Sequence, residues 1–315
     1  MGEPYKYIFT IFTPTYNRAH TLARVYCSLK RQSFKSFEWL VIDDGSSDGT
    51  QKLISSWKRE SPFDIRYYWQ KNSGKHVAIN RGVRLARGEF FLIADSDDAF
   101  MSYALERFYL HWNSIPKKIR KQFSAVGCHC IDEEGRPIGK PFPEDPLDSN
   151  SEEIYFRYKI TSEKWGVHRT DVLKQFPFPE INAKFLPESF IWNRIAKYYK
   201  VRFVNEYMRI YYQDAGNQIM KKEITEIASR RFFYADSLNL SSEWLPYDPI
   251  RFLKNGTQYV RFCLWSRESM RIQWKRLFSK TAKIIWFVSI VPGLIIWAAD
   301  KKIPDSWLSN KILRI

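Results

Sequence analysis

The sequence contains few cysteines, and their arrangement excludes a disulfide-rich fold. Four of the 315 residues are cysteine: Cys27, Cys128, Cys130 and Cys263. A secreted disulfide framework needs more cysteines at closer spacing, so we expect a reducing compartment. Cys128 and Cys130 flank His129. Because no second ligand pair accompanies this triplet, it favours a half-buried strand over a zinc site.

Signals for disorder, repeats and secretion are also missing. Hydrophobic residues make up 44% of the sequence and aromatics 17%, which excludes a disordered or low-complexity chain. The sequence shows no internal repeat at a fixed period. Its N-terminus lacks the basic and long apolar segments of a secretory signal, so we expect the body of the protein in the cytoplasm.

The positive charge is concentrated near the C-terminus. The formal net charge is +16, from 50 Lys and Arg against 34 Asp and Glu. Residues 251–315 hold 13 of these basic residues against Glu268, Asp300 and Asp305, whereas the first 250 residues are nearly balanced. A basic C-terminal segment on a domain whose charges nearly cancel favours a segment that anchors the protein over a nucleic-acid-binding surface.

Apolar strands alternate with helical patterns through the first 110 residues. We expect strands at 7–13, 37–42, 65–70 and 89–94, with helices near 22–29, 53–57 and 77–87. Further strands are expected at 125–131 and 201–212, with a helix within 185–199. This order predicts an α/β fold with a mostly parallel sheet flanked by helices.

Two acidic clusters follow predicted strands. Asp43 and Asp44 end the second strand, and Asp95 and Asp97 follow the fourth. Ligands of such sheets bind beyond the carboxyl ends of the strands, where both clusters fall. Paired carboxylates there can hold a divalent cation and leave positions open for substrate phosphates, whereas one isolated cluster favours a solvated turn. Repulsion between two facing acidic clusters favours a bound cation or ligand.

Five successive motifs resemble those of family 2 inverting glycosyltransferases with the GT-A fold, of the bacterial surface-polysaccharide type. They are Phe12–Arg18, Val41–Thr50, Gly74–Gly82, Ala86–Glu89 and Asp95–Asp98. Their order and spacing match over roughly the first 110 residues, and the resemblance continues less tightly to about residue 212. It implies a metal-dependent transferase that moves a sugar from a nucleotide diphosphate to a hydroxyl group, with inversion.

The resemblance also implies which residues bind the nucleotide. Pro14, Asp43 and Asp44 would line the base pocket, with Asp44 as the partner of the uracil ring. Lys75 and Asn80 would lie near the base and the diphosphate. The alternatives are a solvated loop lysine for Lys75 and a helix-surface amide for Asn80.

Asp95 and Asp97 would form the Asp-x-Asp motif of the family. The resemblance implies that Asp97 contacts Mn²⁺ or Mg²⁺ directly, and that Asp95 serves both the metal and the ribose. Asp214 is the candidate for a third metal ligand, with a turn residue as the alternative.

The displacement also needs a base that removes a proton from the attacking hydroxyl. In the family, this base usually comes from an acidic pair that opens a helix roughly 90 residues after the Asp-x-Asp motif. In this sequence Glu188 occupies that position, and the next residue is Ser189 instead of a second acid. The alternative for Glu188 is a favourable charge at a helix N-terminus. Trp165 is the candidate apolar wall for the acceptor sugar, and a core tryptophan is the equal alternative.

Residues 284–299 form a run of 16 uncharged, mostly apolar residues interrupted by Pro292 and Gly293. Because an untilted spanning helix needs ~20 residues, the run predicts a re-entrant or interfacial hairpin. Residues 267–284 show the pattern of a basic amphipathic helix, which is typical of an anionic membrane interface. A helical region packed on the body or at a subunit interface is the alternative.

We therefore expect a catalytic domain at 1–220, with a nucleotide-binding half at 1–110 and an acceptor half at 111–220. A helical basic region would follow at 221–315, with 258–300 associating with a membrane. The expected partners are a UDP-sugar, a glycan or polyprenyl-diphosphate-linked acceptor and an anionic membrane, without nucleic acid. The protein would lie at the cytoplasmic face of the inner membrane, peripheral or monotopic. The competing hypotheses are a nucleic-acid- or membrane-binding module without catalysis, and a pseudoenzyme.

Overall fold

The protein is described here by a computed structural model that covers residues 5–181, 183, 186–212 and 227–301. The described residues form two compact units. The first unit comprises the chain up to Phe178 and the stretch that begins at Tyr198, and the second comprises Pro179–Lys197 and the C-terminal helices. Asp214, the candidate third metal ligand, lies outside the described residues.

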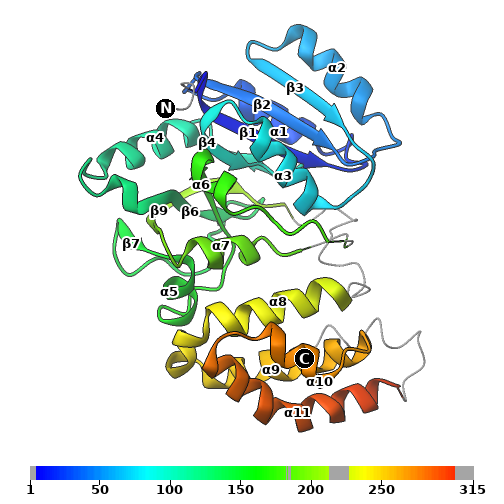
Figure 1. Ribbon diagram of the computed structural model, residues 1–315. Helices are drawn as coiled ribbons and strands as arrows, with labels where there is room; N and C mark the ends of the chain where they lie inside the picture. The colour runs from blue at the N-terminus through cyan, green and yellow to red at the C-terminus, as the bar shows by residue number, and fades with distance from the viewer. Residues whose placement is uncertain (1–4, 182, 184–185, 213–226, 302–315) are drawn as a thin grey trace. The chain divides into compact units, whose positions relative to one another are not determined.

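A mixed nine-stranded sheet forms the centre of the first unit (Figure 1). Its strands are β1 Tyr7–Thr15, β2 Phe37–Asp43, β3 Asp64–Trp69, β4 Gly88–Ile93, β5 Ala99–Phe100, β6 Phe123–Ile131, β7 Leu147–Ser149, β8 Lys164–Arg169 and β9 Lys200–Ile210. The strand order is β3-β2-β1-β4-β8-β6-β9-β5, and β7 pairs with β9. The first four strands are parallel, whereas β8 is antiparallel to β4 and β6. The α/β class is confirmed, and the parallel half is the one that the sequence predicted.

Helices cover both faces of this sheet. They are α1 Ala23–Lys30, α2 Thr50–Glu60, α3 Lys75–Leu85, α4 Ala104–Ser114, the short η1 Arg120–Gln122, α5 Ser151–Phe156 and α6 Thr170–Gln175. Successive strand residues face opposite sides, so Phe9 packs in the core with residues of α1, α2 and α4. Phe12 points to the other face, where α3 passes so close that a Cβ atom at Gly82 would lie 2.4 Å from the Phe12 ring. The residues that follow β1, β2 and β4 are left at the carboxyl edge of the sheet.

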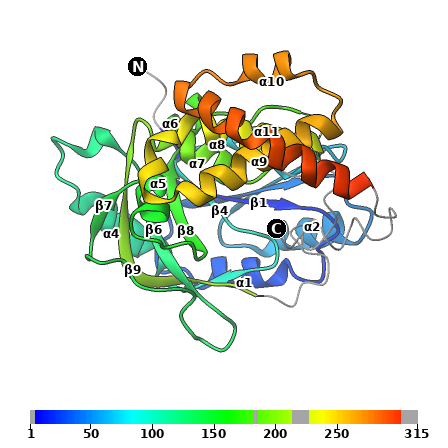
Figure 2. The ribbon, with the colours of Figure 1, turned by 90° about the horizontal axis from the view of Figure 1, so that it is seen from below.

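The described part of the second unit is helical. Its helices are α7 Ser189–Ile195, α8 Ile227–Leu240, η3 Ser242–Tyr247, α9 Pro249–Trp265, α10 Met270–Arg276 and α11 Lys280–Lys301. α9 and α11 run side by side in both views (Figures 1 and 2). Small residues permit this approach, because a Cβ atom at Gly293 would lie 2.7 Å from Val260.

The structure corrects two expectations for the C-terminal region. The predicted interfacial hairpin is wrong, because α11 is one helix that continues through Pro292. Packing of its length against α9 outweighs the local cost of a proline inside a helix. The predicted amphipathic helix over residues 267–284 is also interrupted, since α10 ends at Arg276 and Leu277 has an extended backbone.

Candidate active site

The carboxyl ends of three neighbouring strands meet at one edge of the sheet. In the β1–β2 register, Pro14 pairs with Ile42 and Thr15 with Asp43. On the other side of β1, the Ala94 amide after β4 donates to the Phe12 carbonyl over 2.8 Å. The predicted residues that follow these strands therefore share this edge, as parallel pairing requires.

Asp43 and Asp44 are both buried at the end of β2 and organise the adjacent loops. The Asp43 carboxylate accepts from the Ser46 amide over 2.7 Å and from the Tyr67 hydroxyl over 2.6 Å. The Asp44 carboxylate accepts from the amide of Gly74 and from neighbouring groups, over 2.8 to 2.9 Å. The two carboxylates therefore hold the loop after β2 and the loop between β3 and α3, which border the candidate base pocket.

Lys75 and Asn80 lie on α3 but have different surroundings. The Lys75 Nζ atom lies 2.6 Å from Asp95 Oδ1, so this lysine belongs to the acidic cluster. The Asn80 side chain is buried, and its amide exchanges hydrogen bonds of 2.9 and 2.8 Å with the Phe178 backbone. This pairing gives Asn80 a structural contact, and its role at the nucleotide stays a prediction.

Arg209 from β9 is the principal site residue that the sequence analysis missed. Its Nη2 atom lies 3.1 Å from Asp95 Oδ2, and its Nε donates to Asp98 Oδ2 over 2.7 Å. One signal in the sequence could have identified Arg209. It stands between Met208 and Ile210 in a predicted strand, and a charge that is buried in a strand requires a partner of opposite charge. Arg209 is only 5% exposed, and its neighbouring carboxylates raise its pKa against the opposing effect of burial.

The three aspartates after β4 have different electrostatic surroundings. Burial opposes ionisation of Asp95, but Lys75 and Arg209 lower the pKa of its carboxyl group. The pKa of Asp97 is raised, first by burial and then by the charge of Asp95. Burial also raises the pKa of Asp98 to about 7, although Arg209 opposes it. The negative charge of Asp95 is thus balanced by Lys75 and Arg209. An additional positive charge near Asp97 would stabilise the ionised form of its carboxyl group.

Asp97 is the carboxylate best suited to an added cation. Its Oδ2 atom lies 3.8 Å from Arg18 Nη1, which is longer than a hydrogen bond. Arg24 holds the Asp97 backbone, since its Nη1 atom donates to the carbonyl over 3.0 Å. Among the described residues, no group of three or more His, Cys, Asp or Glu side chains is placed to bind a metal. Hard cations accept carboxylate and phosphate oxygens together, so the two aspartates of the Asp-x-Asp motif fit a site that the donor completes.

The structure corrects the expected role of Trp165. Its ring is 5% exposed and packs against Phe100 and Phe108 in the core. The indole nitrogen donates to the Ile93 carbonyl over 2.6 Å, which satisfies its one polar group. Trp165 is therefore the core tryptophan of the alternative, and its ring supports β4 from inside instead of forming an exposed wall for a sugar.

Glu188 belongs to the second unit, where it is the N-cap residue of α7. Its side chain makes no capping hydrogen bond to the helix backbone. Its predicted role as the base stays a prediction.

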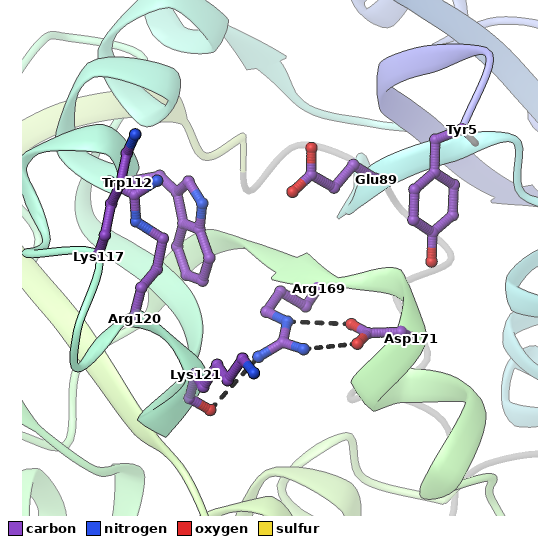
Figure 3. Close-up of a pocket in the computed structure, with 8 residues that line it drawn as sticks. All are labelled: Tyr5, Glu89, Trp112, Lys117, Arg120, Lys121, Arg169 and Asp171. Atoms are coloured by element: carbon purple, nitrogen blue, oxygen red, sulfur yellow. Dashed lines mark hydrogen bonds and ion pairs between the residues drawn. The ribbon is translucent and has the colours of Figure 1, made fainter. Parts of the chain in front are cut away.

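A separate cavity of about 330 Å³ lies at the opposite end of β4 (Figure 3). It is lined by Glu89 at the start of that strand, together with Tyr5, Trp112, Lys117, Arg120, Lys121, Arg169 and Asp171. Arg169 is turned toward Asp171, with Nη2 and Nε both bonded to its carboxylate. A strand of six residues is roughly 20 Å long, so this cavity is distinct from the acidic cluster.

Comparison with solved structures shows that the fold is the one found in glycosyltransferases. The structure resembles S. aureus TarS 1–349 in complex with UDP-GlcNAc, with a TM-score of 0.64 and 17% identity over 93% of this chain and 91% of that one. It also resembles the mannosyltransferase PcManGT from Pyrobaculum calidifontis in complex with GDP-Man and Mn²⁺, with a TM-score of 0.50 and 15% identity over 94% and 88% of the chains. The GT-A fold is thereby confirmed.

The family follows from the sequence. The glycosyl transferase family 2 model matches residues 10–169, half of the chain, and the protein belongs to that family of transferase enzymes. It is 27% identical to the Campylobacter jejuni GalNAc(5)-diNAcBac-PP-undecaprenol beta-1,3-glucosyltransferase, over 64% of this chain and 63% of that protein. It is 25% identical to the Borreliella burgdorferi cholesterol galactosyltransferase, over 68% and 62%. The chain thus spans less than two thirds of the length of these relatives.

Proposed function

We propose that this protein transfers a sugar from a UDP-sugar to a hydroxyl group of a lipid-linked or cell-surface glycan, with inversion and with the help of Mn²⁺ or Mg²⁺. The names of both relatives describe transfer to lipid-linked or lipid acceptors, and TarS was solved with UDP-GlcNAc. The pairing of Asp95 with Lys75 and of Asp95 and Asp98 with Arg209 supports the proposal, because it brings opposite charges together beside the Asp-x-Asp motif, where we expect the donor.

The nucleotide would be held by the ends of β1 and β2. A carboxylate oxygen of Asp44 would accept the imide N–H of uracil, and Pro14 would contact the ring. Asp44 is suited to this because backbone and side-chain donors already orient its carboxylate. Lys75 would place its charge beside the diphosphate while it remains close to Asp95.

Asp97 would be the principal protein ligand of the divalent cation, with Asp95 beside it near the ribose. Both residues offer the oxygen donors that such cations prefer. Burial and the charge of Asp95 raise the pKa of Asp97, so a nearby cation would stabilise its ionised form. A bound cation would stabilise the negative charge of the UDP leaving group. Arg209 would keep Asp95 oriented, because it is buried and bonded to both Asp95 and Asp98.

Glu188 would act as the base of the reaction. It would accept the proton of the acceptor hydroxyl while the oxygen attacks the anomeric carbon, and the bond to UDP breaks on the opposite side. One displacement of this kind inverts the anomeric centre. Glu188 stands at the N-terminus of α7, and its side chain makes no capping hydrogen bond to that helix.

Turnover by the full chain tests this proposal. Purified protein would be incubated with Mn²⁺, a panel of UDP-sugars and an undecaprenyl-diphosphate-linked glycan, and UDP release would be measured. Asp97→Asn and Glu188→Gln should each reduce turnover by about a hundredfold or more. Asp132→Asn is the matched control, because Asp132 pairs with Arg136 in an exposed turn, and it should leave turnover unchanged. Absence of turnover with every donor, or full activity of both variants, would contradict the proposal.

A further inference from the structure

One face of α11 is a continuous stripe of exposed, large apolar side chains. The stripe consists of Ile284, Phe287, Val288, Val291, Leu294 and Ile295. Phe287 is 68% exposed and Ile284 is 65% exposed. Their spacing of three or four residues places them along one side of the helix. Contiguous apolar surface of this kind marks an interaction site.

The opposite face of α11 is fixed to α9. A Cβ atom at Gly256 would lie 2.4 Å from the Ser289 hydroxyl, which shows how closely the two helices approach. Near the end of α11, the Asp300 carboxylate is buried and accepts from Arg261 Nε over 2.6 Å and from Nη2 over 2.8 Å. Removal of α11 from α9 would leave both charges unpaired, so the helix is held on this support.

Basic and aromatic residues border the start of the stripe. Lys275 and Lys280 are exposed, and Lys283 lies 4.8 Å from the centre of the Trp274 ring. The Phe278 side chain, between α10 and α11, is exposed as well. Tryptophan and lysine beside an apolar helix face are characteristic of helices that lie in the headgroup region of an anionic bilayer.

We infer that the exposed stripe of α11 docks on a bilayer that contains anionic lipids, with the helix axis parallel to the membrane plane. The apolar side chains enter the acyl boundary, and the lysines meet lipid phosphates. This inference rests on the lipid-linked acceptor proposed above, but its test requires no sugar transfer.

The same helix is long and apolar enough to cross a membrane by length and composition. If α11 crossed the bilayer, the face of α9 that packs against it would either enter the hydrocarbon core or lose its contacts with α11. That face includes Arg261, and α9 also holds the exposed residues Arg251 and Lys254. Charged side chains at the centre of a bilayer are costly, so the contacts with α9 favour the parallel orientation.

Vesicle binding by the full chain tests the docking surface. The protein should sediment with vesicles that contain phosphatidylglycerol and much less with vesicles of phosphatidylcholine alone. Phe287→Glu combined with Val291→Glu should weaken binding about tenfold or more, because two carboxylates would replace exposed apolar groups that enter the bilayer on docking. Leu110→Glu combined with Ile119→Glu changes the charge equally at exposed sites in the first unit, and it should bind as the unchanged protein does.

Two results of this assay would overturn the inference. One is equal vesicle binding by the α11 variant and its control. The other is that the unchanged chain does not bind vesicles. This result would also be expected if the stripe joined two copies of the protein in solution. Because the assay needs no donor or acceptor, its failure is distinguishable from a failure of the proposed transfer.

The orientation is tested by the depth of two labelled positions. Ile284 and Ile295 are 11 residues apart on the stripe, or about 16 Å along the helix. Nitroxide labels on Ile284→Cys and Ile295→Cys, each made with Cys27→Ser to remove the exposed cysteine, should report similar depths in bound protein. A depth difference near the full 16 Å would show a spanning helix and refute the parallel orientation.

Discussion

Replacement of Arg209 by methionine tests whether the acidic cluster depends on this buried cation. In the native protein, Arg209 bonds to Asp98 over 2.7 Å, to Asp95 over 3.1 Å and to Glu163 over 3.2 Å. Arg209→Met would leave the buried carboxylate of Asp98 without its countercharge and would leave Asp95 with Lys75 alone. Loss of one partner from a buried ion pair costs about 3–5 kcal/mol, so we expect a decrease of that size in the free energy of unfolding.

Urea unfolding of the full chain would measure this loss at pH 8. Because Arg209 opposes the effect of burial on the pKa of Asp98, its removal raises that pKa further, and part of the loss is the free energy of protonating this carboxyl group. Adding Asp98→Asn to Arg209→Met should recover about 1–3 kcal/mol, because the double variant no longer buries that unpaired charge. Arg136→Met is the control, since its pair with Asp132 is on the surface, and it should cause no measurable change. The reasoning is refuted if Arg209→Met behaves like this control, or if the Asp98 substitution gives no recovery.

Three further predictions concern single positions. Gly293→Leu should destabilise the protein by about 1–3 kcal/mol in thermal unfolding, because even its Cβ atom would meet Val260 at 2.7 Å; an unchanged Tm would contradict the close packing of α9 and α11. Trp165→Ala should lower the free energy of unfolding by about 3–5 kcal/mol, because it removes a buried indole ring. Trp165→Phe should leave the KM for the acceptor unchanged. If Trp165→Phe instead raised this KM without any change in stability, Trp165 would be a wall of the acceptor site. Lys75→Ala should weaken UDP binding about tenfold in calorimetry, and undiminished affinity would exclude a role at the diphosphate.

The parallel half of the sheet could be predicted because its signals are local. β1 and β2 are short apolar stretches that end at Thr15 and Asp43, and the intervening α1 has a helical spacing of apolar residues. Parallel pairing then determines which residues share an edge, without any knowledge of side-chain packing. The location of Asp43 and Asp95 at one edge follows from these facts alone.

Features that depend on distant contacts could not be predicted in the same way. The contact between Arg209 and Asp98 joins residues 111 positions apart, and it depends on β9 pairing with β5 beside the motif. Pro292 and Gly293 favour a break locally, but packing against Val260 keeps α11 continuous. The burial of Trp165 likewise requires β8 to enter the sheet between β4 and β6. In each case the outcome depends on tertiary contacts that the local sequence does not show.

We propose that the acidic edge binds a nucleotide diphosphate together with a divalent cation through Asp97. Titration of UDP into the full chain, with and without Mn²⁺, tests this claim most directly. We predict that Mn²⁺ tightens UDP binding to the unchanged protein by about tenfold or more, and that Asp97→Asn removes this effect. The same UDP affinity with and without Mn²⁺, or an undiminished effect in Asp97→Asn, would contradict the account.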